Sequence, residues 1–95
     1  MRITIAACML VVLSACSGAP VQEMSDARQA IRAAQAAGAA DKAPAELSRA
    51  QALIDEAQRR LQRREYKQAE ANAIEAREEA VRALEAARAA SDPVQ

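Results

Sequence analysis

Apolar residues follow two different patterns along this chain of 95 residues. From Ile3 to Leu13 they form an almost unbroken run, whereas after Pro20 they recur at alternating steps of three and four residues. The second spacing places apolar side chains on one face of an α-helix. No stretch alternates apolar and polar residues with a period of two, as a half-buried strand would. The pattern therefore predicts an all-α protein behind a short apolar leader.

The first predicted helix begins near Glu23 or Ser25 and ends near Ala37. Glycine is the favoured residue just past a helix end, so Gly38 is the expected stop. Residues 39–43 are expected to form a loop. The apolar face of this helix consists of Met24, Ala27, Ile31, Ala34 and Gly38.

The second predicted helix begins at Pro44, whose missing N–H costs nothing in a first helical turn. Glu46 lies in the same turn, close to the positive end of the helix dipole. The apolar face of this helix consists of Leu47, Ala50, Ile54, Ala57 and Leu61.

Beyond Leu61 the apolar stripe resumes one residue late, at Tyr66, Ala69, Ala73, Ala76, Ala80, Ala83 and Ala87. A slip of one residue turns the face of a straight helix by about 100°. One explanation is a tight turn near residues 63–65 between two antiparallel helices. The alternative is one continuous helix or coiled coil over residues 44–90, favoured by the lack of Gly and Pro at the turn. Because a hairpin buries both faces, we predict two or three antiparallel helices.

The leader carries Arg2 before an apolar run that is shorter than the about 20 residues needed to span a bilayer. This order matches the n-region and h-region of a secretory signal. The tetrapeptide Leu13-Ser14-Ala15-Cys16 follows and resembles the bacterial lipobox. The resemblance implies cleavage between Ala15 and Cys16, with a diacylglycerol thioether and an N-acyl chain on Cys16.

These features divide the chain into a signal peptide (1–15), a lipidated tether (16–22), an alanine-rich helical domain (23–90) and a disordered tail (91–95). In the lipoproteins that this leader resembles, an aspartate after the cysteine retains the protein at the inner membrane. Ser17 occupies that position and favours the periplasmic side of the outer membrane. The outer leaflet of the inner membrane is the alternative.

The charge and composition of the chain exclude several classes of function. Lys and Arg number 13, as do Asp and Glu, and cleavage removes Arg2, which leaves 12 basic residues against 13 acidic ones. Nucleic-acid binders carry a basic excess, so no nucleic-acid partner is expected. The chain has no histidine, and only Cys16 of its two cysteines survives cleavage. We therefore expect no enzyme activity, no cofactor, no metal site and no small-molecule substrate.

Five cations lie close together in the sequence: Arg59, Arg60, Arg63, Arg64 and Lys67. They could form a patch for anionic lipid, lipopolysaccharide or a cell-wall polymer. The alternative, which we favour, is a solvated helix face with ion pairs at helical spacing such as Asp55–Arg59 and Glu56–Arg60. The alanine stripe also has two possible roles. It could bind a second copy of this chain or another protein, or it could pack on the chain's own second helix.

Two resemblances follow from the helical segments. Glu65-Tyr66 followed by Ala69 and Ala73 resembles the helical hairpin of a tetratricopeptide repeat. The wider pattern resembles a family of small bacterial lipoproteins defined by an alanine-rich domain of unknown function, sometimes found ahead of a peptidoglycan-binding domain of the outer-membrane-protein-A type. That pattern is Ala27-Arg28, Gly38-Ala39, Ala43-Pro44-x-Glu46-Leu47, Tyr66-x-x-Ala69 and the closing alanine ladder. Lys42 departs from it, since family members often carry an aromatic residue there.

Together these patterns predict a non-enzymatic envelope lipoprotein, held on a membrane by Cys16, that presents a helical module to the periplasm. Its expected partner is an envelope protein or a second copy of itself. One alternative is a small membrane-active lipoprotein of the toxin type. Another is a cell-wall tether, which would be non-covalent because the chain ends in Pro93-Val94-Gln95 and not in the lysine used for covalent attachment.

Overall fold

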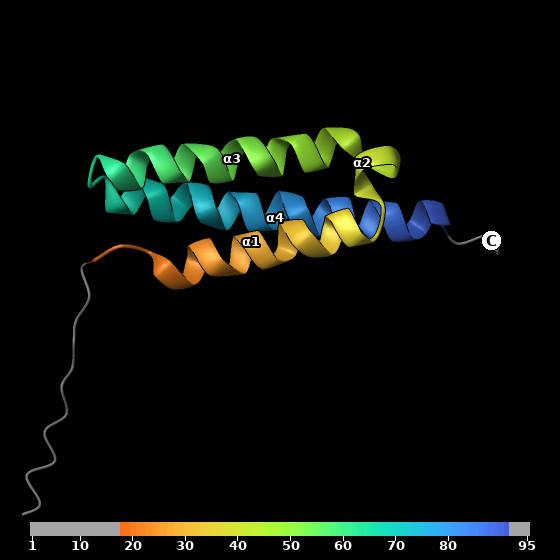
Figure 1. The fold of residues 1–95 in the computed structure, drawn as a ribbon, viewed down its shortest axis with the longest axis horizontal. Coiled ribbons are helices and arrows are strands. Elements are labelled where there is room, and N and C mark those ends of the chain that lie inside the picture. Colours follow the sequence, from red (N-terminus) through yellow and green to blue (C-terminus); the bar gives the residue numbers. More distant parts are fainter. Residues whose placement is uncertain (1–17, 92–95) are drawn as a thin grey trace, which may run out of the picture.

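A computed structural model describes residues 18–91. Its helices are α1 (Val21–Ala36), α2 (Ala39–Lys42), α3 (Pro44–Gln62) and α4 (Tyr66–Ser91), and no strand occurs within these residues (Figure 1). The all-α prediction is confirmed. None of the described helices is both long enough and apolar enough to cross a bilayer.

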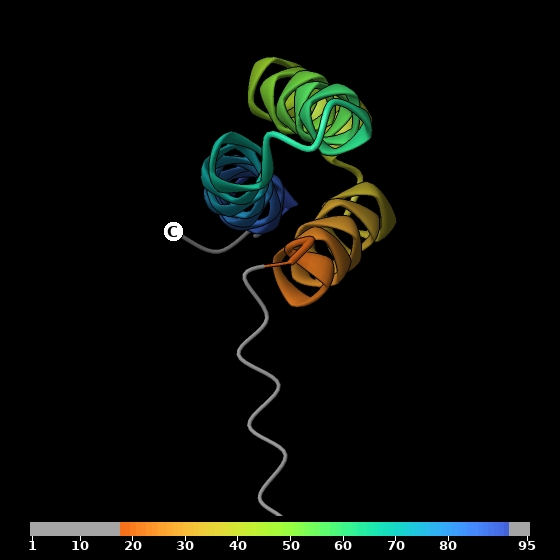
Figure 2. The ribbon, with the colours of Figure 1, turned by 90° about the vertical axis from the view of Figure 1, so that its left-hand side faces the viewer.

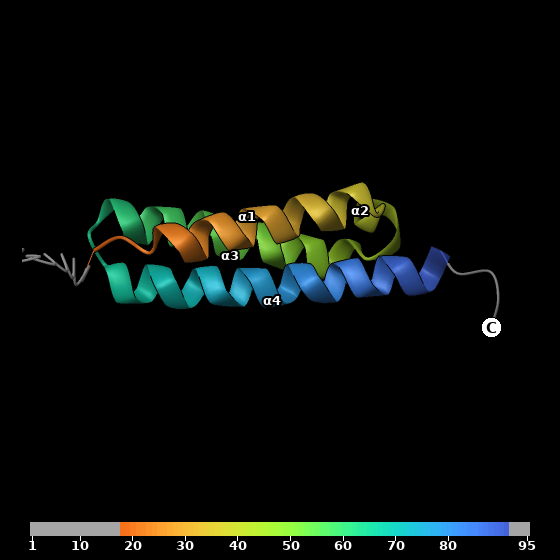
Figure 3. The same cartoon turned by 90° about the horizontal axis from the view of Figure 1, so that it is seen from below.

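The second and third predicted helices fold back on each other, as the slip of the apolar stripe predicted. Helices α3 and α4 lie antiparallel, joined by a turn at residues 63–65, and α1 runs beside α4 in the same direction (Figures 1 and 3). The hairpin is therefore confirmed, and the continuous helix over residues 44–90 is excluded. Tyr66, where the apolar stripe was predicted to resume, is the first residue of α4 and is half-buried.

Helix α4 is the spine of the bundle. It packs along both α1 and α3, whereas α1 and α3 contact each other sparsely (Figure 2). Six alanines on α4 are 0% exposed: Ala69, Ala73, Ala76, Ala80, Ala83 and Ala87. Because helix axes approach according to the side chains between them, methyl groups let α4 lie close to two neighbours at once. The alanine stripe is thus buried inside the bundle and is not a free seam for a partner.

The few large apolar side chains fill the space between α1 and α3 above this spine. Met24, Ile31 and Leu47 are buried, in line with the predicted faces of the first two helices. Ile54 and Leu61 on α3 are only half-buried, in keeping with the sparse contact between α1 and α3. The core is therefore thin and consists chiefly of alanine.

The connection between α1 and α3 differs from the prediction. Gly38 ends the first helix as expected, with a φ of 85° that glycine adopts without strain. The loop expected at residues 39–43 is instead the single helical turn α2, closed by a 2.8 Å hydrogen bond from the N–H of Ala43 to the carbonyl of Ala39. Both of these alanines are buried, so packing holds the segment in a helical turn too short for periodicity to detect.

Candidate basic end of the bundle

The predicted site residues fall into two groups. Ala15 and Cys16, the predicted cleavage and lipidation positions, lie outside the described residues, as do the predicted signal peptide and residues 92–95. The described chain starts at Gly18, and Pro20 is already buried immediately ahead of α1. The five predicted cations are all described and lie where α3 ends and α4 begins.

The turn between α3 and α4 is a Schellman motif. The N–H of Glu65 donates to the carbonyl of Arg60 at 2.9 Å, and the N–H of Arg64 donates to that of Leu61 at 3.0 Å. Arg64 takes the left-handed position of the motif, with a φ of 61°, and is the only described residue other than glycine with a positive φ. Glycine usually occupies this position because a Cβ is strained there. The chain thus reverses direction without glycine or proline, at the cost of strain at Arg64.

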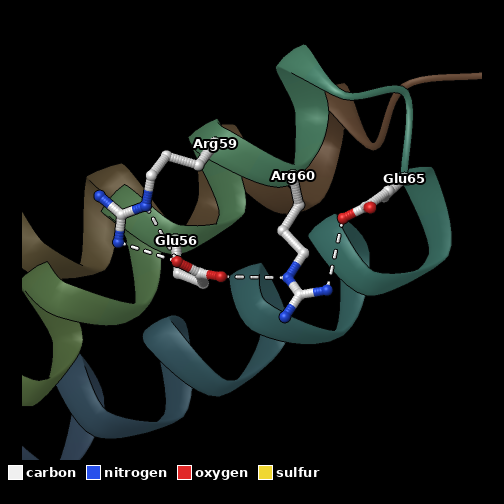
Figure 4. A network of polar contacts seen from close by, with 4 residues as sticks. All are labelled: Glu56, Arg59, Arg60 and Glu65. Atoms are coloured by element: carbon white, nitrogen blue, oxygen red, sulfur yellow. Dashed lines mark hydrogen bonds and ion pairs between the residues drawn. The ribbon is translucent and has the colours of Figure 1, made fainter.

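A row of alternating charges runs along the end of α3 into this turn (Figure 4). Arg59 contacts the carboxylate of Glu56 at 2.8 Å. Arg60 contacts the other oxygen of the same carboxylate at 3.1 Å and Glu65 at 3.3 Å. The Glu56–Arg60 pair was predicted from helical spacing, whereas the predicted Asp55–Arg59 pair is not formed, because Arg59 binds Glu56 instead. The Arg60–Glu65 pair crosses the turn, and no helical spacing could have indicated it.

The two arginines change the acidity of Glu56. The hydrogen bond donated by Arg59 is the main cause that lowers the pKa of the Glu56 carboxyl, and the nearby charges of Arg59 and Arg60 add to it. Both causes favour the ionised carboxylate. Arg59 and Arg60 are therefore engaged with carboxylates of the chain itself.

The remaining cations are Arg63, Arg64 and Lys67, which we call the basic turn. All are exposed, and none forms an ion pair within residues 18–91. The structure thus separates the predicted cluster into two arginines that are neutralised on α3 and a group of unpaired cations at the tip of the hairpin. Guanidinium and ammonium groups in this state can donate hydrogen bonds to an anion in the solvent or on a surface.

A groove opens between α1 and α3 on the side away from α4. It has a volume of about 410 Å³ and is lined by Arg28, Ile31, Arg32, Gln51, Ile54 and Asp55. One polar contact spans the two helices beside it, a 2.5 Å hydrogen bond from Arg28 to Gln58. The sequence did not indicate this groove, because side chains of two separate helices line it and the spacing within either helix carries no sign of it.

No group of three or more His, Cys, Asp or Glu side chains within residues 18–91 is arranged to hold a metal ion. In searches among curated proteins and among solved structures, no match was found for this chain. A family model described as a domain of unknown function (DUF4398) matches residues 22–92, which include every described helix except the first residue of α1. Because this match covers most of the chain, the protein belongs to the DUF4398 family.

Proposed function

We propose that this protein is a non-enzymatic envelope lipoprotein, anchored through acyl chains on Cys16, whose helical bundle serves as an interaction or structural module. The observation that carries the proposal is the position of Cys16. It follows Leu13-Ser14-Ala15 directly and precedes the folded bundle, which starts at Val21, by only a few residues. Small residues at the cleavage site and a nucleophilic thiol are what diacylglyceryl transfer and signal cleavage require.

The acyl chains are expected to anchor the protein permanently. A single fatty chain gives marginal and reversible membrane binding, whereas two or more give stable attachment. In this proposal, lipid on Cys16 supplies the membrane attachment. Ser17 after the lipidated cysteine supports a final position on the periplasmic side of the outer membrane.

The experiment is metabolic labelling with a fatty acid in the native host. The wild-type protein and Cys8→Ala should incorporate label, because Cys8 leaves with the signal peptide. Cys16→Ala should incorporate none and should accumulate as the uncleaved precursor. Equal labelling of Cys16→Ala and the wild type would refute the proposal. Density-gradient separation of the membranes then tests the outer-membrane position.

An interaction module is the function that the bundle supports best. The six alanines of α4 are buried inside the bundle, and the shallow groove between α1 and α3 remains open on its outer surface. Photo-crosslinking from Gln51, an exposed residue in that groove, should capture an envelope protein in intact cells. The same crosslinker at Ala71, exposed on α4, is the matched control. A protein captured equally from both positions would argue against the groove as the binding surface.

The toxin-like alternative predicts membrane damage. Among the described residues only Val21 and Ile74 are large, apolar and exposed, which gives an amphipathic helix little with which to enter a bilayer. The unlipidated protein should therefore release no dye from anionic vesicles. Release at low micromolar protein would favour the toxin-like function over the interaction module.

A further inference from the structure

The basic turn and the start of α1 lie at the same end of the bundle. Met24 packs with Ala57 and Ala73 in one buried cluster, which places these residues at the same height along the bundle. Tyr66 precedes Ala73 by seven residues, or about 10 Å of helix, whereas Pro20 precedes Met24 by four, or about 6 Å. The tip of the hairpin therefore projects about 4 Å beyond the point where the chain enters the bundle (Figures 1 and 3).

Covalent geometry limits how far this end can lie from Cys16. Cys16 lies four positions before Pro20, and even a fully extended chain spans at most about 14 Å over those four steps. Helix α4 runs from Tyr66 at this end to Ser91 at the opposite end, and its 26 residues make it about 39 Å long. If Cys16 is lipidated as proposed above, the basic turn is the part of the bundle held next to the bilayer surface.

The side chains at this end suit a lipid surface. Arg63, Arg64 and Lys67 are exposed and unpaired within the described chain, while the neighbouring Arg59 and Arg60 are neutralised by carboxylates. Val21, which begins α1, is also at this end and is 72% exposed. Exposed cations together with an exposed apolar side chain are typical of segments that bind at a membrane interface.

The backbone at Arg64 is a separate indication. A residue other than glycine in the left-handed position of a turn is strained, and such strain is found where a side chain has a role. Arg64 holds this position with a φ of 61°, where glycine would make the same turn without strain. Arg64 is exposed in the turn between α3 and α4, at the same end of the bundle as the start of α1.

We propose that the basic turn, Arg63, Arg64 and Lys67, binds the anionic headgroups of the membrane that holds the acyl chains of Cys16. This contact stands the bundle upright, with α2 and the C-terminal end of α4 directed away from the lipid. The side of the bundle offers little apolar surface for a competing contact, because the only other large apolar side chain exposed in the described chain is Ile74. The inference rests on the lipidation proposed above.

The test uses the lipidated protein, purified from cells and inserted into vesicles of phosphatidylcholine with or without phosphatidylglycerol. Lipid blocks the thiol of Cys16, and Cys8 is removed with the signal peptide. A single added cysteine is therefore the only free thiol and can be labelled with a fluorophore. Gln62→Cys reports the basic turn and Ala89→Cys the opposite end, both from exposed positions. With a quencher attached to lipid headgroups, the Gln62 label should be quenched in phosphatidylglycerol vesicles and the Ala89 label should not.

Neutralising the basic turn provides the decisive comparison. In the variant Arg63→Gln, Arg64→Asn, Lys67→Gln, asparagine is used at 64 because it tolerates a positive φ. Each basic side chain near an anionic surface is worth about a fivefold shift, so the ratio of docked to undocked protein should fall roughly a hundredfold. The control variant, Arg32→Gln, Arg77→Gln, Arg88→Gln, removes the same charge from exposed positions elsewhere and should keep the quenching. Circular dichroism verifies that both variants remain helical.

Each outcome decides between the hypotheses. Quenching of the Gln62 label that persists in the neutralised variant, or without phosphatidylglycerol, would overturn the headgroup contact while leaving the anchor intact. Quenching at Ala89 would mean that the bundle lies flat, and quenching at neither position would mean that it is undocked; both contradict the proposal. A protein that fails to float with vesicles of either kind would refute the lipidation itself, which separates that failure from a failure of the basic turn.

Discussion

The guanidinium of Arg49 on α3 lies 3.4 Å from the carboxylate of Glu79 on α4, measured from Nε to Oε2. The other oxygen of Glu79 is bound by Arg82 at 2.6 Å. Oε2 itself is shielded from solvent and has no hydrogen bond. Arg49 therefore compensates the charge on an oxygen that water does not reach, and in doing so joins the two helices of the hairpin.

We expect Arg49→Ala to lower the free energy of unfolding by about 1 kcal/mol, because it leaves that oxygen without a compensating charge. Arg32→Ala, at an exposed arginine without an ion pair in the described chain, should change it by less than about 0.5 kcal/mol. Urea unfolding followed by circular dichroism measures both. Equal effects of the two substitutions would show that the contact with Glu79 contributes nothing.

Glu56 predicts a dependence of stability on pH. Its pKa is lowered in the folded protein, first by the hydrogen bond from Arg59, relative to the ordinary value of 4.5. A lowered pKa in the folded state contributes stability that is present above the unfolded pKa and is lost as the pH falls through the folded one. The contribution should therefore be complete at neutral pH and should be lost as the pH falls below 4.5 and through the lower pKa of the folded state.

Titration of the side-chain carboxyl carbons by NMR checks this directly. The midpoint of Glu56 should lie below that of glutamate in an unstructured peptide, and Arg59→Gln should return it toward that value. In Glu56→Gln the corresponding part of the acid dependence of unfolding should vanish. A midpoint at or above the peptide value would contradict the ion pairs with Arg59 and Arg60.

The position of the hairpin was predictable because burial leaves a record in the sequence. The apolar stripe shifts by one residue between Leu61 and Tyr66, and a straight helix could not bury both parts of it on one side. The turn lies at that shift, although neither Gly nor Pro marks it. Arg64 occupies the position where glycine is expected. The composition of the turn therefore favoured a continuous helix, whereas the apolar periodicity correctly favoured the hairpin.

Features that depend on contacts between helices could not be predicted from the sequence. The turn α2 is held by the burial of Ala39 and Ala43, and a segment of this length has no periodicity to detect. The division of the cations into paired and unpaired groups depends on Glu65, which meets Arg60 only because the chain reverses there. Helical spacing describes neighbours along one helix, and both of these features lie outside it.

The buried alanines of α4 lead to a prediction on packing. Ala80 is 0% exposed, and α4 packs along two other helices, so Ala80→Leu must push helices apart or distort its own rotamer. Such overpacking costs about 1–3 kcal/mol. Ala89→Leu, at an exposed position of the same helix, should change stability by less than about 0.5 kcal/mol. Thermal unfolding of the two variants compares them. Equal melting temperatures would mean that the spine of the bundle is looser than the structure indicates.

The strain at Arg64 gives the last prediction. Arg64→Gly removes a Cβ whose steric strain in the left-handed position costs about 1 kcal/mol. Glycine in turn loses more conformational entropy on folding, but this loss is smaller than the strain that is removed. We expect a net stabilisation of about 0.5 kcal/mol, which raises the melting temperature by about 2–4 °C in a domain of this size. Arg63→Gly is the control. Its φ of −89° suits any residue, so glycine there only adds freedom to the unfolded chain and should lower the melting temperature.

If Arg64 contacts lipid, this substitution should separate stability from function. The glycine variant should melt later than the wild type and yet show weaker quenching at Gln62 on anionic vesicles. A variant that is both more stable and equally docked would show that the arginine has no role at the membrane, and the strained position would then lack an explanation. A lower melting temperature for Arg64→Gly would instead mean that the guanidinium stabilises the turn itself, and the strain would be offset within the fold.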